Sequence, residues 1–162
     1  MEIGWTYAVL AGWLGTALMT MAMMGGRLMG IATDLVAMLG LMVVPPKRKK
    51  AVYAVGLAMH FGLGALFGVV YAVVLTGLGV VSVPGWMAIW GALLGLVHGV
   101  VVGVGMALVP AVHPRMGHGQ VLEMPGLFGR HLGVGMPVAL LLLHAIYGVT
   151  AAVTYFVGMA QP

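Results

Sequence analysis

Charged residues are scarce in this sequence, and cysteine is absent. Asp, Glu, Lys and Arg make up only 6% of the 162 residues, whereas a soluble domain has about 25%. So few charges cannot cover a water-exposed surface, but a lipid bilayer surrounds helices that are apolar on every side. The lack of cysteine excludes disulfides, thiolate-bound metals and iron–sulfur clusters.

The common catalytic motifs are also missing. The sequence has no phosphate-binding glycine loop, no nucleophile elbow and no H-E-x-x-H motif. The net charge of +4 comes from seven basic residues on short segments between apolar stretches. These charges predict membrane orientation and contact with lipid rather than nucleic-acid binding, and no soluble small-molecule substrate is indicated.

Apolar residues make up 62% of the chain, and four stretches reach the length of about 20 residues that crosses a bilayer. The predicted spans are residues 3–24, 51–75, 86–109 and 136–157. A fifth stretch, residues 28–44, is shorter and contains Asp34, so we predict a helix that lies at the interface or dips into the membrane. The sequence therefore predicts an all-α, single transmembrane domain over residues 1–162, in the form of a four-helix bundle.

The basic residues predict the direction of the spans. With four spans, all seven fall on one side of the membrane, and short basic loops stay cytoplasmic. The tryptophans lie toward the opposite ends of their helices, as an interfacial belt does. Both termini are therefore predicted on the non-cytoplasmic side. The basic residues are Arg27, Lys47, Arg48, Lys49, Lys50, Arg115 and Arg130, and the tryptophans are Trp5, Trp13, Trp86 and Trp90.

The second and fourth spans share the pattern H-x3-G-x6-Y, and both run from inside to outside. This match predicts a duplicated helical hairpin with a pseudo-two-fold axis along the membrane normal. The matching residues are His60, Gly64 and Tyr71 in the second span and His144, Gly148 and Tyr155 in the fourth.

Small residues recur every four positions on several spans, which lets helices approach closely in lipid. The third span has Gly91, Gly95, Gly99 and Gly103, and the second has Gly56, His60, Gly64 and Gly68. Such faces serve packing inside the bundle, docking onto a partner protein, or both. Because they exceed what four helices are expected to use internally, we predict that other membrane subunits cover some of them.

Three histidines, His60, His98 and His144, lie within the predicted spans at similar depth. Ionisable residues inside a membrane are functional candidates. Three interpretations remain open: interhelical hydrogen bonds only, ligation of a haem b iron by His60 and His144, or binding of a transition metal or relay of protons. No carboxylate lies at the same depth, which disfavours a proton pump and a non-haem iron site.

The loop between the third and fourth spans contains a second cluster, formed by His113, Met116 and His118 together with Met124 and His131. Methionine and histidine together are the ligands that Cu(I) prefers. Methionine also fills gaps in apolar cores, and the chain has 15 of them without a repeated M-x-x-M spacing. A copper site at this loop is therefore the weaker of the two metal hypotheses.

Several short motifs resemble those of small bacterial four-helix membrane proteins of unknown function. They are residues 18–21 and 26–30, the helix around His60, the pair His113-Pro114, and His144 with Tyr147-Gly148. The resemblance extends over most of the chain and implies a location in the bacterial inner membrane, but no activity.

The leading functional expectation is a non-catalytic membrane subunit of a larger complex, of an energy-transducing or electron-transfer kind. The extramembrane segments are too short to form a catalytic domain. The alternative is a redox or transport protein that binds haem or a metal through its intramembrane histidines.

Overall fold

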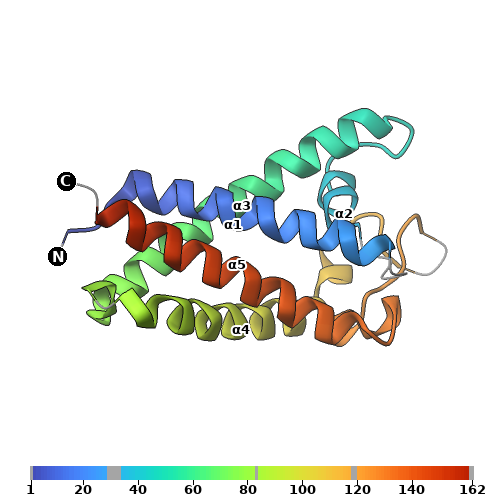
Figure 1. The fold of residues 1–162 in the computed structure, drawn as a ribbon. Helices are drawn as coiled ribbons and strands as arrows, with labels where there is room; N and C mark the ends of the chain where they lie inside the picture. Colours follow the sequence, from blue (N-terminus) through green and yellow to red (C-terminus); the bar gives the residue numbers. More distant parts are fainter. Residues whose placement is uncertain (1, 29–33, 83, 118–119, 161–162) are drawn as a thin grey trace.

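The computed structural model describes residues 2–28, 34–82, 84–117 and 120–160, and these residues form helices joined by turns. Four of the helices are long and run through the whole molecule, whereas the others are short (Figure 1). The elements are α1 (Trp5–Leu28), α2 (Leu35–Leu41), α3 (Lys49–Gly77), η1 (Val80–Ser82), η2 (Pro84–Trp86), α4 (Met87–Gly105), η3 (Val109–Ala111), η4 (Leu127–Leu132) and α5 (Met136–Met159).

Four helices are long and apolar enough to cross a membrane, the same number as the long apolar stretches of the sequence. They cover Trp5–Arg27, Lys49–Gly77, Met87–Gly105 and Met136–Met159. The third span ends four residues before its predicted end, because the chain turns at residues 106–108 and continues as the short helix η3, which contains Pro110. These four helices fit a multi-pass membrane protein.

The predicted interfacial helix over residues 28–44 is shorter than expected. Its described part is α2, a helix of seven residues that is too short to span a bilayer; residues 29–33 lie outside the described part of the chain. Asp34 is its N-cap, because the Asp34 carboxylate accepts a hydrogen bond from the Ala37 backbone N–H at 2.9 Å. In Figure 1, α2 lies at the end of the molecule opposite the two termini.

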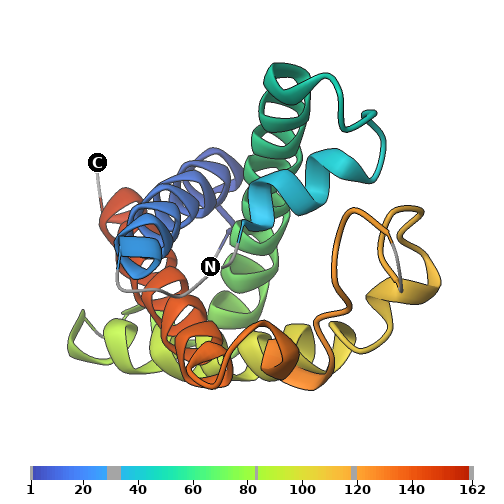
Figure 2. The same ribbon diagram turned by 90° about the vertical axis from the view of Figure 1, so that its right-hand side faces the viewer.

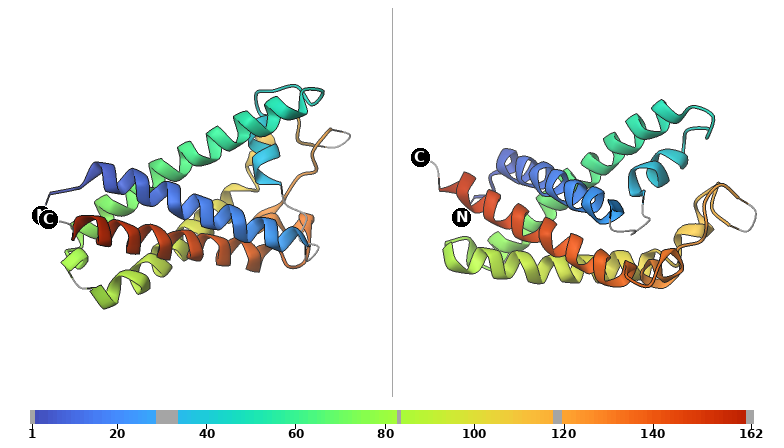
Figure 3. Two further views of the ribbon diagram at one scale, coloured as in Figure 1. Left: turned by 45° about the horizontal axis from the view of Figure 1, so that its top comes forward. Right: turned by 45° about the vertical axis from the view of Figure 1, so that its right-hand side comes forward.

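The long helices follow one another around an arc in the order α4, α5, α1, α3. Helix α5 packs along α4 and α1, helix α1 packs along α3, and α2 packs on α3. Seen from the α2 end, the arc is open between α3 and α4 (Figure 2). These two helices meet at only a few positions, near the turn that joins them, and diverge toward α2 (Figure 3).

This order differs from what a two-fold relation between hairpins requires. Such an axis would exchange α1 with α4 and α3 with α5, so α3 and α4 should pack together as α1 and α5 do. The α1–α5 contact is extensive and the α3–α4 contact is small. The two hairpins, α1–α3 and α4–α5, are instead arranged in sequence around the arc.

Glycines bring the helices of each hairpin into close contact. A Cβ atom on Gly12 would overlap the backbone of Gly64 in α3, and a Cβ atom on Gly148 would overlap the carbonyl oxygen of Gly91 in α4. Gly56 is in similarly close contact with α2, at the backbone of Val36. The four-residue glycine faces are thus covered within the chain. The buried glycines of these faces are Gly56, Gly64, Gly68, Gly91, Gly95, Gly99 and Gly103.

The connection from α4 to α5 folds back onto α4 through an aromatic side chain. The ring of Phe128 lies against Gly103, where an added Cβ atom would be 2.8 Å from the Phe128 Cγ atom. Phe128 has a φ angle of 54°, a left-handed backbone conformation that is unfavourable for a bulky residue. The contact between its ring and the glycine face offsets this strain.

We predict that Gly148→Ala destabilises the protein by about 1–3 kcal/mol, because the added methyl group must push α4 and α5 apart. Gly62→Ala is the matched control, since Gly62 lies exposed on α3 with no atom within 4 Å of an added Cβ. This control should be neutral or stabilising by up to about 1 kcal/mol. Unfolding in detergent, followed by circular dichroism, compares the two, and equal effects would contradict the described α4–α5 contact.

Candidate functional site

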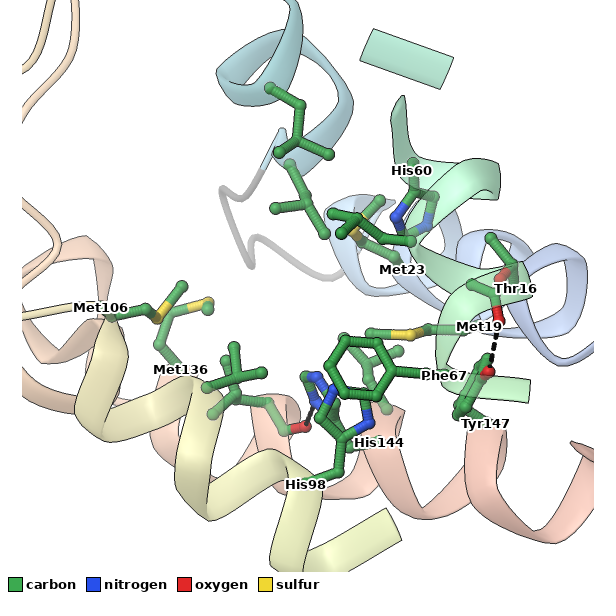
Figure 4. A pocket seen from close by; sticks show the side chains of 17 residues that line it. Thr16, Met19, Met23, His60, Phe67, His98, Met106, Met136, His144 and Tyr147 are labelled. Atoms are coloured by element: carbon green, nitrogen blue, oxygen red, sulfur yellow. Dashed lines mark hydrogen bonds between the residues drawn. The ribbon is translucent and has the colours of Figure 1, made fainter. Parts of the chain in front are cut away.

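A cavity of about 250 Å³ lies between α3 and α4, in the opening of the arc. Helices α1 and α5 form its floor, and α2 contributes Leu35 and Leu39 at one end. Its lining is almost wholly apolar and includes no Asp, Glu, Lys or Arg among the described residues. The cavity exists because α3 and α4 diverge after their shared turn. Figure 4 shows the side chains around it.

His144 reaches the cavity from α5 and is held by its own helix. Its Nδ1 atom lies 2.7 Å from the carbonyl oxygen of Leu140. A carbonyl oxygen only accepts, so Nδ1 carries the proton and Nε2 keeps its lone pair. The residue is 6% exposed, and its Cβ atom would be 3.1 Å from a Cβ atom on Gly99 of α4. The absence of a side chain at that position therefore leaves the space that the imidazole occupies.

His60 reaches the cavity from α3, and a threonine of α1 determines its tautomer. The Thr20 hydroxyl donates to the carbonyl oxygen of Thr16 at 2.7 Å. It therefore accepts a hydrogen bond from His60 Nε2, which lies 3.1 Å away. This hydrogen bond places the proton of the buried His60 ring on Nε2, with the lone pair on Nδ1.

His98 of α4 is surrounded by aromatic rings rather than hydrogen-bond partners. Its ring stacks on Phe67 of α3, with centroids 3.8 Å apart and an interplanar angle of 29°. It meets the ring of His144 edge-on at 4.8 Å. Within the described part of the chain, two polar atoms buried here have no hydrogen-bond partner: His98 Nδ1 and the hydroxyl oxygen of Tyr71.

Tyr147 connects the helices at the floor of the cavity. It extends from α5, and its hydroxyl donates to the carbonyl oxygen of Gly64 in α3 at 2.7 Å. Its ring also lies against Gly15 of α1, where an added Cβ atom would be 2.9 Å away. The side chain therefore links three helices, and in Figure 4 it lies to the right of His144 and His98.

All three intramembrane histidines singled out from the sequence line this one cavity. The structure brings His98 and His144 into contact, whereas His60 lies on the opposite wall (Figure 4). From the sequence, His60 was paired with His144 and His98 was left alone, because a two-fold arrangement of the hairpins was assumed. Phe67 and Tyr147 were not recognised from the sequence as residues of the site. Tyr147 follows His144 by three residues, so the helical period already places both on one face.

The second cluster serves a structural purpose at the end of the cavity. The Nε2 atom of His113 donates to the carbonyl oxygen of Met38 at 3.0 Å, and its Nδ1 atom accepts the backbone N–H of Arg115 at 3.2 Å. With both ring nitrogens engaged, His113 has no lone pair left for copper. Met116 is buried, and His118 lies outside the described residues. No group of three His, Asp or Glu side chains in the described part is arranged to hold a metal ion.

Helix α2 is held from both sides. The Arg115 guanidinium donates to the carbonyl oxygen of Leu41, which adds to the His113 contact from the α4–α5 connection. On the other side, the Asp34 carboxylate accepts hydrogen bonds from Arg27 of α1 at 3.0 Å and from the Tyr53 hydroxyl of α3 at 2.6 Å. These bonds connect α1, α3 and the α4–α5 connection to the segment that closes one end of the cavity.

No protein-family profile, curated protein sequence or solved structure matches this chain. The functional argument therefore rests on the geometry of the site. That geometry is an apolar cavity at membrane depth, with two imidazole lone pairs fixed by hydrogen bonds within the chain.

Proposed function

We propose that the protein binds a small apolar molecule from the bilayer in the cavity between α3 and α4, with the intramembrane histidines as its polar contacts. The observation that carries this proposal is the cavity of about 250 Å³ lined by three histidines on an otherwise apolar wall. Pockets with an apolar lining and a few polar groups are the typical form of small-molecule sites.

The residues that line the cavity support a ligand that enters from the lipid rather than from water. Leu63 contributes to the cavity wall and is also 44% exposed, so the cavity is open to the outside at this residue of α3. The cavity therefore reaches the surface that lipid chains cover. Because its described lining has no charged side chain, an ion or a sugar would lose its hydration without compensation there.

Haem b, the cofactor considered from the sequence, fits the cavity less well. The lone pairs of His60 and His144 are suitable iron ligands. However, about 250 Å³ is below the range of about 300–1,000 Å³ for pockets of drug-sized ligands, and a porphyrin is larger than most of these. The described residues of the lining also offer no Lys or Arg to pair with the haem propionates. These observations favour a ligand of one or two rings.

We further propose that the protein works as a subunit beside a partner membrane protein that supplies or consumes the ligand. The short extramembrane elements support this role, because the described residues outside the spans form only α2, short 3₁₀ helices, one isolated β-bridge and turns. The glycine faces no longer support it, since they are covered within the chain. If the protein isolated in mild detergent migrates alone, at its own mass plus detergent, this second proposal is wrong.

We also propose that the two hairpins arose by duplication. Their equivalent contacts support it: Gly64, four residues after His60, meets Gly12 of α1, and Gly148, four residues after His144, meets Gly91 of α4. With Gly12 and Gly91 equivalent, Met19 of α1 corresponds to His98. Both side chains line the cavity. The two hairpins therefore share a similar contact between their helices. They differ at one position of the cavity wall, which is Met19 in the first hairpin and His98 in the second.

The first prediction of this function concerns the occupancy of the cavity. Val102 lines the cavity from α4, and Val102→Phe fills part of it. Native mass spectrometry of protein purified in mild detergent should show a non-protein adduct on the natural protein that Val102→Phe removes. Val101→Phe is the matched control, because Val101 is 64% exposed toward lipid, and it should keep the adduct. A natural protein without an adduct, or an adduct that survives Val102→Phe, would contradict the proposal.

The second prediction concerns orientation in the bacterial inner membrane, with both termini on the non-cytoplasmic side. The separation of the basic residues around α2 from the end that holds both termini supports this orientation (Figure 1). The chain has no cysteine of its own, so single cysteines can be labelled cleanly. Cysteines at Glu2 and at Ala160 should react with an impermeant reagent outside intact cells, whereas one at Lys49 should not. Labelling at position 49 would show that the orientation is the reverse of the one proposed.

A further inference from the structure

We infer that the ligand has an aromatic ring with two hydroxyl groups, of the hydroquinone (quinol) class, and that the site prefers it to the oxidised quinone. This inference rests on the proposed function and specifies the chemistry that the cavity recognises. It concerns binding alone and includes no electron transfer.

The tautomers of the histidines determine what the cavity can recognise. The N–H groups of His144 and His60 are already used on Leu140 and Thr20, so each ring offers the ligand a lone pair only. The two residues lie on opposite walls of the cavity (Figure 4). A ligand with two hydroxyl groups that point in opposite directions can donate to both, as a para-hydroquinone does.

The shape of the cavity favours a flat ring. Phe67 and His98 line the cavity as a pair of rings stacked on each other, and Tyr147 lies on the floor. Aromatic groups attract other rings through offset-stacked and edge-to-face contacts. A volume of about 250 Å³ is larger than the cavity of about 150 Å³ that binds benzene in an engineered protein. The space therefore suits one ring with small substituents.

The depth of the site agrees with a lipid-soluble quinol. His60 is 11 residues from the start of α3 and His144 is 8 residues from the start of α5, which corresponds to roughly 12–17 Å along the helices. The ring would thus lie within the hydrocarbon region. The opening beside the exposed Leu63 leads into the same region, where an isoprenoid tail stays in lipid.

The affinity of the cavity for the ligand should depend strongly on the oxidation state of the ligand ring. A quinone has two carbonyl oxygens that only accept, and these would face the lone pairs of His60 and His144. Among the three histidines, only His98 has an N–H group that is not already engaged, so a quinone keeps at most one hydrogen bond. The loss of the hydrogen bonds corresponds to an affinity about tenfold lower.

The test compares three probes on the full chain in nanodiscs of dimyristoyl phosphatidylcholine. Calorimetric titration under anaerobic conditions measures the affinity for duroquinol, duroquinone and the dimethyl ether of duroquinol, which has the same ring without a donor. Duroquinol should bind about tenfold more tightly than both other probes. This comparison needs no variant, so a folding defect cannot obscure it.

Variants then locate the effect. His60→Leu and His144→Leu should each lower the affinity for duroquinol toward that for duroquinone. His131→Leu is the matched control, because His131 is exposed on η4 and lies outside the cavity lining, and it should keep the preference.

The outcomes separate the inference from the function on which it rests. If all three probes bind equally and Val102→Phe abolishes their binding, the cavity is a ligand site but the quinol inference is overturned. If duroquinol binds Val102→Phe as tightly as the natural protein, both the quinol inference and the proposed function are overturned. If duroquinol binds about tenfold more tightly than the other probes, and His60→Leu or His144→Leu removes this preference, the quinol inference and the proposed function are both supported.

Discussion

The close approach of helices at glycine determines the shape of this protein. Lipid chains are as apolar as leucine, so helices in a membrane associate through tight packing rather than through a hydrophobic driving force. In each hairpin, a glycine of the first helix contacts a glycine of the second helix. Gly12 contacts Gly64, and Gly91 contacts Gly148. The hairpins then join through α1 and α5, which leaves α3 and α4 at the two ends of an arc. The cavity is the space that this order leaves open.

The histidines occupy that space under a second constraint. A polar group in a low-dielectric interior is costly when it has no partner. His60 and His144 each satisfy one ring nitrogen through a neighbouring oxygen of the chain. Among the residues that the structure describes, the other nitrogen of each ring has no such partner, and it belongs to the wall of the cavity. A bundle that needed these residues only for stability would gain by pairing both nitrogens, as His113 does at the α2 end. This contrast between half-paired and fully paired histidines is the reason to assign a ligand to the cavity.

Much of this architecture could be predicted from the amino-acid sequence, for physical reasons that apply locally. Length and hydropathy identify the four spans, because a bilayer demands about 20 apolar residues from each. The depth of the three histidines follows from helical rise. The cavity could not be predicted, because it depends on the angle at which α3 leaves α1, and sequence periodicity does not encode that angle. The same limit explains why the glycine faces were assigned partly to outside partners, although each of them packs within the chain. Of the loop cluster, His113 was considered as a copper ligand only in the weaker of the two metal hypotheses. Its hydrogen bond to the backbone of Met38, 75 residues away in sequence, is visible only in the folded chain.

The central claim is that the chain fixes two imidazole lone pairs in an apolar cavity. Solid-state ¹⁵N nuclear magnetic resonance of histidine-labelled protein in bilayers measures this directly, because protonated and bare ring nitrogens have well-separated chemical shifts. Single substitution of each histidine assigns the signals. The account predicts that His144 is a neutral ring protonated at Nδ1, and that His60 is a neutral ring protonated at Nε2. A His144 ring protonated at Nε2, or either ring protonated at both nitrogens, would contradict it.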